Sequence, residues 1–428
     1  MKIFIAGAML LFAAASWFLY HQTTSMPQPH CDIDSKAYLE RGTLFYNTNK
    51  FVTAHHPQQP YYALGYALFI GLAYKIFGQS LGVIILLQLL VALISCLLMM
   101  RMAQRLFGLR ARCWVPVLFA CNLGYLVFVQ FVLTEIVLSF FLLLFFERLT
   151  AYFHRQQLPV LAQAGLALGC SMIIKPAAMY FVFVVCAMLA LGLVGACKLR
   201  LLRSVLFALC FYLPVIGYMT YNYQAFGNFA LCTLDKINLY YWFFPNVLAY
   251  EHGTTSDAER KQLLAHQSDE VVGKLFWQKV VHKPLLVGYV WLLNVMKTCA
   301  GLYATNLKVL VEPQVFGGAI SYFKIPGGWC AKAWGYITAG ATRPWVVAVT
   351  LFEVFYSLMR YILCAVALWF LFRKKQWLAL ATIVIFIAYF ALITGHDGCA
   401  RFRMMFEFLL IVLAAGGLGS INVIKCER

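Results

Sequence analysis

Charged residues are scarce in this chain, and acidic residues are the scarcer of the two kinds. Only 12% of the 428 residues are Asp, Glu, Lys or Arg, whereas 63% are hydrophobic and the mean hydropathy is +0.78. An ordinary soluble domain has about 25% charged and about 45–50% apolar residues. This shortage of charge excludes a soluble enzyme, a nucleic-acid-binding module and a disordered protein. It leaves a polytopic integral membrane protein, for which each helical span needs about 20 apolar residues.

Ordered cysteine spacing is lacking as well. The chain has 14 cysteines, but no two of them form a CxxC pair, and most lie inside apolar runs. A buried free cysteine behaves as a small hydrophobic residue. The sequence therefore supports neither a zinc site nor a disulfide framework.

Basic residues outnumber acidic ones by 34 to 16, which gives a net charge of +18. The positive-inside rule explains much of this excess without a nucleic-acid partner, because Lys and Arg collect in the short cytoplasmic loops of membrane proteins. With the N-terminus inside, every short inner loop is basic. These loops and the tail carry Arg101, Arg105, Arg110, Arg112, Arg148, Arg155, Lys198, Arg200, Arg203, Arg373, Lys374, Lys375, Lys425 and Arg428.

Apolar runs predict an all-α polytopic membrane protein with roughly ten transmembrane helices and additional helices at the outer surface. The predicted spans are 1–20, 81–100, 113–131, 133–152, 158–175, 177–196, 204–221, 346–372, 376–394 and 404–424. The first is read as an uncleaved span rather than a signal peptide, because Trp17 and Tyr20 are typical interface anchors. The run that starts at Tyr61 is interpreted as a helix on the membrane surface.

These spans divide the chain into three parts. Residues 1–221 form an amino-terminal transmembrane module with a first exported loop at 21–60, and residues 344–428 form the carboxy-terminal spans. Between them lies a long, more polar exported loop, 222–343. Its apolar stretch from Leu285 to Tyr303 is interrupted by Asn294 and Lys297, and it predicts an amphipathic or partly embedded helix.

Ionisable residues at a membrane are costly and need an explanation. In the predicted topology, several of them fall at the outer face although they are far apart in sequence; they are Asp32, Asp34, Glu135, Lys175, Arg401 and Arg403. A carboxylate can take a proton from an attacking hydroxyl, and Lys and Arg can hold a phosphate. Such a set suits displacement at a carbon that is bonded to a phosphate leaving group. Taken singly, each residue has an ordinary structural explanation, such as helix capping or an interface lysine.

Six short motifs carry a resemblance to a known family. They are Asp34 followed by Tyr38, the Pro60-Tyr61-Tyr62 helix that ends in Phe77-Gly78, the Arg-rich loop from Arg101 to Gly108, LTEIVLS and IIKPAA around Glu135 and Lys175, and CARFRMMFEF near the end. In this order they resemble the GT-C glycosyltransferases, membrane enzymes that take a sugar from a polyprenyl-phosphate carrier. The resemblance covers residues 1 to about 225 and 345–425, whereas 222–343 is not matched in detail.

The resemblance implies a role for each matching residue. Asp34, or its neighbour Asp32, would be the general base on the acceptor hydroxyl, with inversion at the anomeric carbon. Glu135 would be a second acid near the acceptor. Lys175, Arg401 and Arg403 would stabilise the carrier phosphate, with Arg403 favoured for the direct contact. Substrate-binding roles also fall on His56 and Tyr62, although this chain has His55-His56-Pro57 where relatives often have Glu-Lys.

The implied enzyme is an inverting glycosyltransferase of a bacterial inner membrane with its site facing the periplasm. Its partners would be a polyprenyl-phosphate-linked sugar, a glycolipid, polysaccharide or protein acceptor, and membrane lipids, but no nucleic acid. Some relatives in the wider fold class use a divalent cation, to which Asp32 and Asp34 could contribute. A transporter or flippase of lipid-linked sugars is the alternative, and a fold that has lost its activity is another.

Two residues are not explained by the resemblance. Glu353 and Arg360 lie two helical turns apart on one face of a predicted span. They either pair with each other, which would neutralise both charges, or line a cavity for the acceptor.

Overall fold

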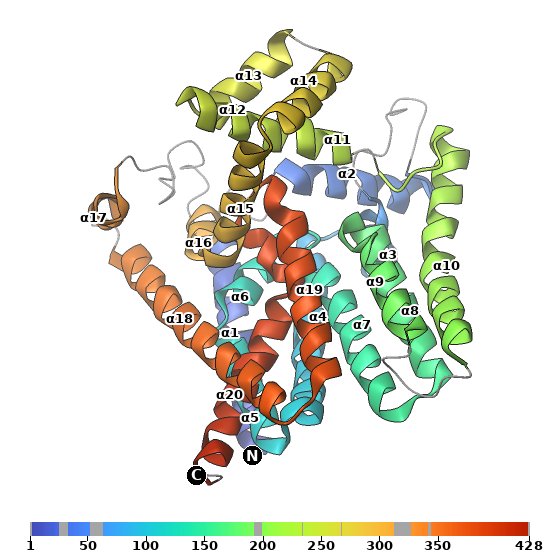
Figure 1. Ribbon diagram of the computed structural model, residues 1–428, viewed down its shortest axis with the longest axis vertical. Coiled ribbons are helices and arrows are strands. Elements are labelled where there is room, and N and C mark those ends of the chain that lie inside the picture. Colours follow the sequence, from blue (N-terminus) through green and yellow to red (C-terminus); the bar gives the residue numbers. More distant parts are fainter. Residues whose placement is uncertain are drawn as a thin grey trace.

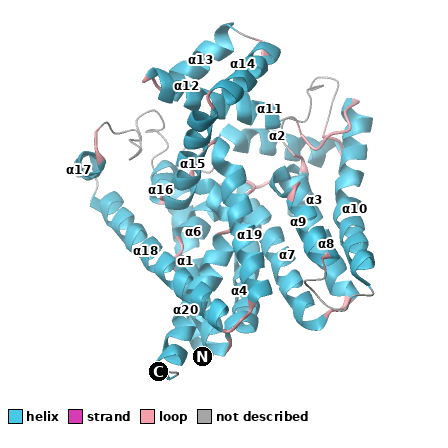
Figure 2. Ribbon diagram, in the orientation of Figure 1, coloured by secondary structure: helices cyan, strands magenta, loops and turns pink. Residues whose placement is uncertain are grey.

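The chain is seen in a computed structural model that describes residues 2–24, 33–51, 63–191, 199–232, 234–266, 268–311, 327–340 and 344–426. Within these ranges all regular secondary structure is helical, as Figure 2 shows. Three predicted site residues, Asp32, His56 and Tyr62, lie outside the described residues.

The amino-terminal half is a run of helices with short connections. They are α1 (Lys2–Thr24), α2 (Ile33–Thr48), α3 (Gly65–Phe77), α4 (Leu81–Phe107), α5 (Leu109–Ala120), α6 (Leu123–Gln130), α7 (Glu135–Arg155), α8 (Leu158–Ile174), the 3₁₀ turn η1 (Pro176–Ala178), α9 (Phe181–Ala190) and α10 (Arg200–Phe226). Glycines end several of them, as at Gly78, whose φ of 87° disfavours any side chain.

The rest of the chain forms an outer group of helices and then the final bundle helices. They are α11 (Leu234–Ile237), the π-helical η3 (Asn238–Phe243), α12 (Phe244–His252), α13 (Ser256–His266), α14 (Asp269–His282), α15 (Pro284–Ala300), α16 (Ala304–Val311), α17 (Trp329–Gly340), α18 (Pro344–Arg373), α19 (Trp377–Ile393), η6 (Thr394–His396), η7 (Ala400–Met405) and α20 (Glu407–Cys426).

The predicted count of ten spans is not confirmed. Among the described residues, six helices are long and apolar enough to cross a membrane, namely α1, α4, α7, α10, α18 and α19. The count rises to eight if each of two bent pairs is one span: α5 with α6, bent by 51°, and α15 with α16, bent by 70°. Helices α8 and α9 have only 17 and 10 residues, which is short of the roughly 20 that a full crossing needs.

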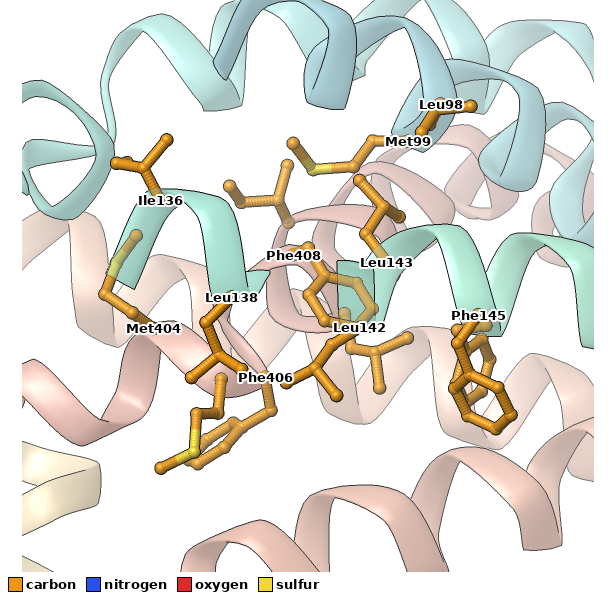
Figure 3. Close-up of a cluster of buried hydrophobic side chains, with 14 of the residues drawn as sticks. Leu98, Met99, Ile136, Leu138, Leu142, Leu143, Phe145, Met404, Phe406 and Phe408 are labelled. Carbon is orange, nitrogen blue, oxygen red and sulfur yellow. The ribbon is translucent and has the colours of Figure 1, made fainter. Parts of the chain in front are cut away.

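The centre of the bundle is apolar and tightly packed. Helices α4 and α7 contact each other and α20. Figure 3 shows side chains from these helices and from η7 packed together in this core, among them Leu98, Met99, Leu142, Phe145, Met404 and Phe408. Close approach is built in where α18 crosses α20, because a Cβ on Gly417 would lie 2.2 Å from the Leu363 carbonyl oxygen. The bundle is therefore a rigid support for whatever its ends carry.

The two ends of the bundle differ as the charge pattern predicts. Figure 1 shows the N- and C-terminal ends together with the α4–α5, α7–α8 and α18–α19 connections at one end, and α2 and α11–α14 at the other. The first end carries the predicted inner loops. The second carries α2 and α11–α14, which belong to the two predicted exported loops. The side of a membrane that each end faces stays a prediction.

Candidate functional site

Four of the predicted site residues come together at the second end of the bundle. Asp34 lies in the first turn of α2, Glu135 is the first residue of α7, Lys175 follows α8, and Arg401 lies in η7. These residues are up to 367 positions apart in sequence. We refer to Asp34, Glu135, Lys175 and Arg401 as the site cluster.

Arg401 is the centre of the site cluster. Its Nε donates to Glu135 Oε1 at 2.5 Å, and its NH1 donates to Asp34 Oδ2 at 2.7 Å. Lys175 Nζ lies 3.7 Å from the same Glu135 oxygen and 4.5 Å from the centre of the Phe402 ring. The two acids and two bases have a formal net charge of zero.

Solvent can reach three of these four side chains. The side chains of Asp34, Lys175 and Arg401 are 30%, 26% and 16% exposed, whereas Glu135 is only 3% exposed. Burial opposes the charged form of Arg401, but the nearby Glu135 and Asp34 outweigh it and raise the pKa of this guanidinium well above its ordinary value. Arg401 therefore stays a cation at all relevant pH values.

Polar contacts behind Glu135 fix the start of α7. The buried Gln88 of α4 donates to the backbone carbonyls of Val129 and Phe131, just before α7, at 3.0 and 2.9 Å. Its own oxygen accepts from the Tyr66 hydroxyl of α3 at 2.7 Å. The Tyr66 ring in turn meets the Tyr38 ring of α2 edge-on. Gln88 is not among the residues predicted from the sequence, although an amide side chain in an apolar span is a signal that could have revealed it.

Arg403 does not join the site cluster. It is 1% exposed, and its Nε donates to Glu407 Oε2 at 2.8 Å. Its NH1 donates to the carbonyls of Cys299 and Gly301 at 2.9 and 2.7 Å. The helix α20 begins after Arg403, as a shared phosphate contact would require, but Arg401 and Arg403 reach different partners. A phosphate contact for Arg403 stays a prediction that this arrangement does not favour.

Glu353 and Arg360 are not paired with each other, and each of these buried side chains binds other groups inside the protein. Glu353 accepts from the backbone N–H groups of Tyr303 and Ala304, both at 2.7 Å. Arg360 forms an ion pair with Glu407. Arg403 joins the two sides, since its NH2 lies 3.8 Å from Glu353 Oε1. We refer to Glu353, Arg360, Arg403 and Glu407 as the buried network.

Glu407 is not among the residues predicted from the sequence. This acid lies four residues after Arg403 in an apolar helix and is fully buried. An intramembrane acid at that spacing from a base was the available signal. The buried network thus has two acids and two bases, which cancel each other in charge.

The site cluster leaves no vacant position for a cation between its acids. A single guanidinium bonds both Asp34 and Glu135, and it already supplies the positive charge there. In the described part of the chain, no group of three or more His, Cys, Asp or Glu side chains is arranged to hold a metal ion.

Comparison with solved structures identifies the fold of this chain. No family model and no curated protein matches the sequence. Solved structures do match, among them the Archaeoglobus fulgidus oligosaccharyltransferase in the apo form, with a TM-score of 0.51 and 12% identity over 98% of this chain and 51% of that one. Another is ArnT from Cupriavidus metallidurans bound to undecaprenyl phosphate, with a TM-score of 0.44 and 14% identity over 98% of this chain and 78% of that one.

These proteins are membrane glycosyltransferases of the GT-C type. The chain has the fold of the oligosaccharyltransferase, so the resemblance seen in its sequence is confirmed at the level of fold. It spans about half the length of the oligosaccharyltransferase chain.

Proposed function

We propose that this protein is an inverting glycosyltransferase that moves a sugar from a polyprenyl-phosphate carrier to a hydroxyl acceptor, at the periplasmic face of a bacterial inner membrane. The observation that carries the proposal is the site cluster, in which a base candidate and two phosphate-binding cations meet at one end of the bundle. Undecaprenyl phosphate bound to the structurally similar ArnT supports this choice of carrier.

In the proposed reaction, the acceptor oxygen attacks the anomeric carbon on the face opposite the phosphate. The bond from that carbon to the phosphate oxygen breaks, and its electron pair stays on the phosphate. Asp34 takes the proton of the attacking hydroxyl. Lys175 and Arg401 stabilise the negative charge that grows on the leaving phosphate, because they are in place before the bond breaks.

Arg401 links donor binding to the base. It bonds both Asp34 and Glu135, which keeps the proposed base paired. A carrier phosphate competes for the same guanidinium, and a phosphate accepts the planar fork of arginine well. The ion pair between Arg401 and Asp34 is then weakened, while Glu135 remains within reach of Lys175.

The test is binding and transfer by the purified protein in nanodiscs. We expect Arg401→Gln and Lys175→Ala each to weaken the binding of undecaprenyl phosphate at least tenfold. Lys75→Ala is the matched control, because Lys75 is another lysine near the end of an apolar helix, on α3, with a contact to Asn49 instead of the site cluster. In cells, loss of the protein should cause one lipid-linked sugar to accumulate. Normal binding by both site variants would overturn the phosphate site.

A further inference from the structure

Two arginines on one short turn bind to different groups of residues. Arg401 and Arg403 both lie in η7, with Arg401 bonded to the site cluster and Arg403 bonded to the buried network. The Phe402 ring between them lies below Lys175. Any displacement of η7 therefore moves Arg401 relative to Asp34 and Glu135.

Arg403 ties η7 to the end of α15. Its two bonds to the carbonyls of Cys299 and Gly301 satisfy acceptors that the end of a helix leaves open. The Tyr303 ring lies 4.4 Å from the guanidinium carbon, and its hydroxyl donates to Glu407. The guanidinium is thus held on the α15–α16 bend by two carbonyl acceptors and by the ring of Tyr303.

The other side of the bend is held by Glu353. Its two oxygens accept the N–H groups of Tyr303 and Ala304, at the start of α16. A carboxylate is well placed there because the start of a helix carries partial positive charge. The 70° bend is therefore fixed by one acid and one base of the buried network.

The end of α15 and the α15–α16 bend also contact η7 and the turn that precedes η7. A Cβ on Gly301 would lie 3.0 Å from the Ala400 backbone nitrogen. One on Gly398, where φ is 68°, would lie 2.7 Å from backbone atoms of Asn294. The Asn294 amide donates to the Gly395 carbonyl at 3.0 Å, so α15 fits the segment 395–400 without spare room.

We propose that Arg403 is a positioning residue, which fixes η7 on the α15–α16 bend so that Arg401 meets Asp34 and Glu135 in the geometry that receives the carrier phosphate. This role rests on the proposed function and replaces a direct phosphate contact by Arg403. The buried network, in this account, exists to place one guanidinium at the site cluster.

A double-mutant cycle with Arg401→Gln and Arg403→Lys tests the proposal. The measured quantity is the dissociation constant for undecaprenyl phosphate in nanodiscs. Arg403→Lys keeps the charge but loses the planar fork, which shifts η7. A misplacement of about 1 Å can cost about 100-fold, so we expect the dissociation constant to rise between about tenfold and about 100-fold. In the Arg401→Gln background, the same substitution should change it less than twofold.

Each of the other possible outcomes has a different meaning. Equal effects of Arg403→Lys in both backgrounds would mean that Arg403 contacts the phosphate itself, which overturns the positioning role and leaves the proposed function intact. No effect of Arg403→Lys in the presence of Arg401 would overturn the positioning role as well. No effect of Arg401→Gln would overturn the proposed phosphate site itself.

Folding is controlled with two further variants. Glu353→Gln weakens the hold on the bend from the opposite side. It removes the charge that lies 3.8 Å from Arg403 but keeps the hydrogen bonds of Arg403 to Glu407, Cys299 and Gly301. We expect it to raise the dissociation constant in the same Arg401-dependent way. Glu147→Gln removes an acid that is just as buried, on α7, where it pairs with Arg105 at 2.9 Å. It should lower the unfolding temperature but leave binding unchanged. If Glu147→Gln weakens binding as much as Arg403→Lys does, the effect is general destabilisation and the inference fails.

Discussion

Asp34 is held by the same guanidinium that holds Glu135, and this sharing decides how the carboxylate can act. A carboxylate that is bonded to arginine is a weak base, because its charged form is stabilised. Its strength as a base is recovered when a second anion takes over part of the guanidinium. In the proposed reaction the donor phosphate would be such an anion, so the ion pair between Arg401 and Asp34 would weaken when the proposed leaving group is in place.

Asp34→Asn keeps the shape of the side chain and removes the base. We expect transfer to fall by about two to four orders of magnitude, which is the usual contribution of general-base catalysis. Binding of undecaprenyl phosphate should be unchanged or tighter, because Arg401 loses one competing partner. Both quantities are measured on purified protein.

Glu40→Gln is the control for this variant, because Glu40 is an exposed acid on the same helix. It should leave transfer and binding unchanged. Full activity of Asp34→Asn would contradict the role of Asp34; if Asp32→Asn were inactive in the same assay, the base would be Asp32.

At the scale of single residues, much of the site cluster could be predicted from the sequence. Asp34, Glu135, Lys175 and Arg401 follow from the order of short motifs and from their common side of the membrane. The separation of Arg403 from Arg401 could not be predicted in this way. Two residues in a 3₁₀ turn point in directions that depend on partners elsewhere in the chain, here the carbonyls at the end of α15.

At the scale of helices, the backbone at the start of α3 packs so closely against the end of α8 that no side chain fits between them. A Cβ on Gly65, the first residue of α3, would lie 2.4 Å from the Ile173 carbonyl oxygen. Since both groups are backbone, Gly65→Ala must displace α3 or the segment that carries Lys175. We expect it to cost about 1–3 kcal/mol of stability and to weaken donor binding. Thermal unfolding and a binding assay check the two effects.

Gly217→Ala supplies the comparison for this prediction. Gly217 lies inside α10, and no atom beyond its own helix lies within 4 Å of the position of a Cβ. Alanine favours a helix over glycine, so this variant should be as stable as the wild type or more so. Equal stability of the two variants would show that α3 and α8 are not tightly fitted.

The outer helices α12 and α14 are joined by charged residues that belong neither to the site cluster nor to the buried network. Glu251 of α12 accepts from Lys279 at 2.7 Å and from Lys283 at 2.5 Å, which joins α12 to the end of α14. These two bonds lower the pKa of Glu251 to about 2. A depressed pKa means that the stabilisation is complete above the pKa of the unfolded chain, near 4.5, and is lost as the pH falls towards 2.

Glu251→Gln should therefore lower the unfolding temperature at pH 7, and the difference from the wild type should shrink between pH 4.5 and pH 2. Differential scanning of the two proteins over this range measures it. Asp257→Asn is the control, because Asp257 is a far more exposed acid in the same outer group, with its side chain 62% exposed. A difference between Glu251→Gln and the wild type that is independent of pH would exclude this pair of lysines as the cause.

Unlike the spans, the breaks between helices could not be predicted from the sequence. The run 113–131 has no charged residue and is mostly apolar, yet the chain bends by 51° between α5 and α6. Asn122 lies at this break, where its oxygen accepts from the Tyr125 N–H and its amide donates to Glu407 at 2.6 Å. The bend depends on a partner 285 residues away, and no periodicity within the run contains that information.

At the scale of the whole molecule, the position of the charges predicts a single orientation in the membrane. An engineered cysteine near Thr255 should react with a membrane-impermeant maleimide added outside, and one at Gln104 should react only after the membrane is opened. Native Cys330 is exposed on α17, at the same end as Thr255, and serves as the internal control. Labelling of Gln104 from outside would invert the topology and place the site cluster in the cytoplasm.

The buried network has a consequence for how the protein is made. Glu353 and Arg360 leave the ribosome on α18 before Arg403 and Glu407 exist, and Arg360 precedes its partner by 47 residues. During that interval, Glu353 can already accept the N–H groups of Tyr303 and Ala304, but Arg360 lacks the acid with which it pairs in the folded protein. An unpaired arginine inside a membrane is costly, so we expect α18 to be held stably in the bilayer only once α20 has been made.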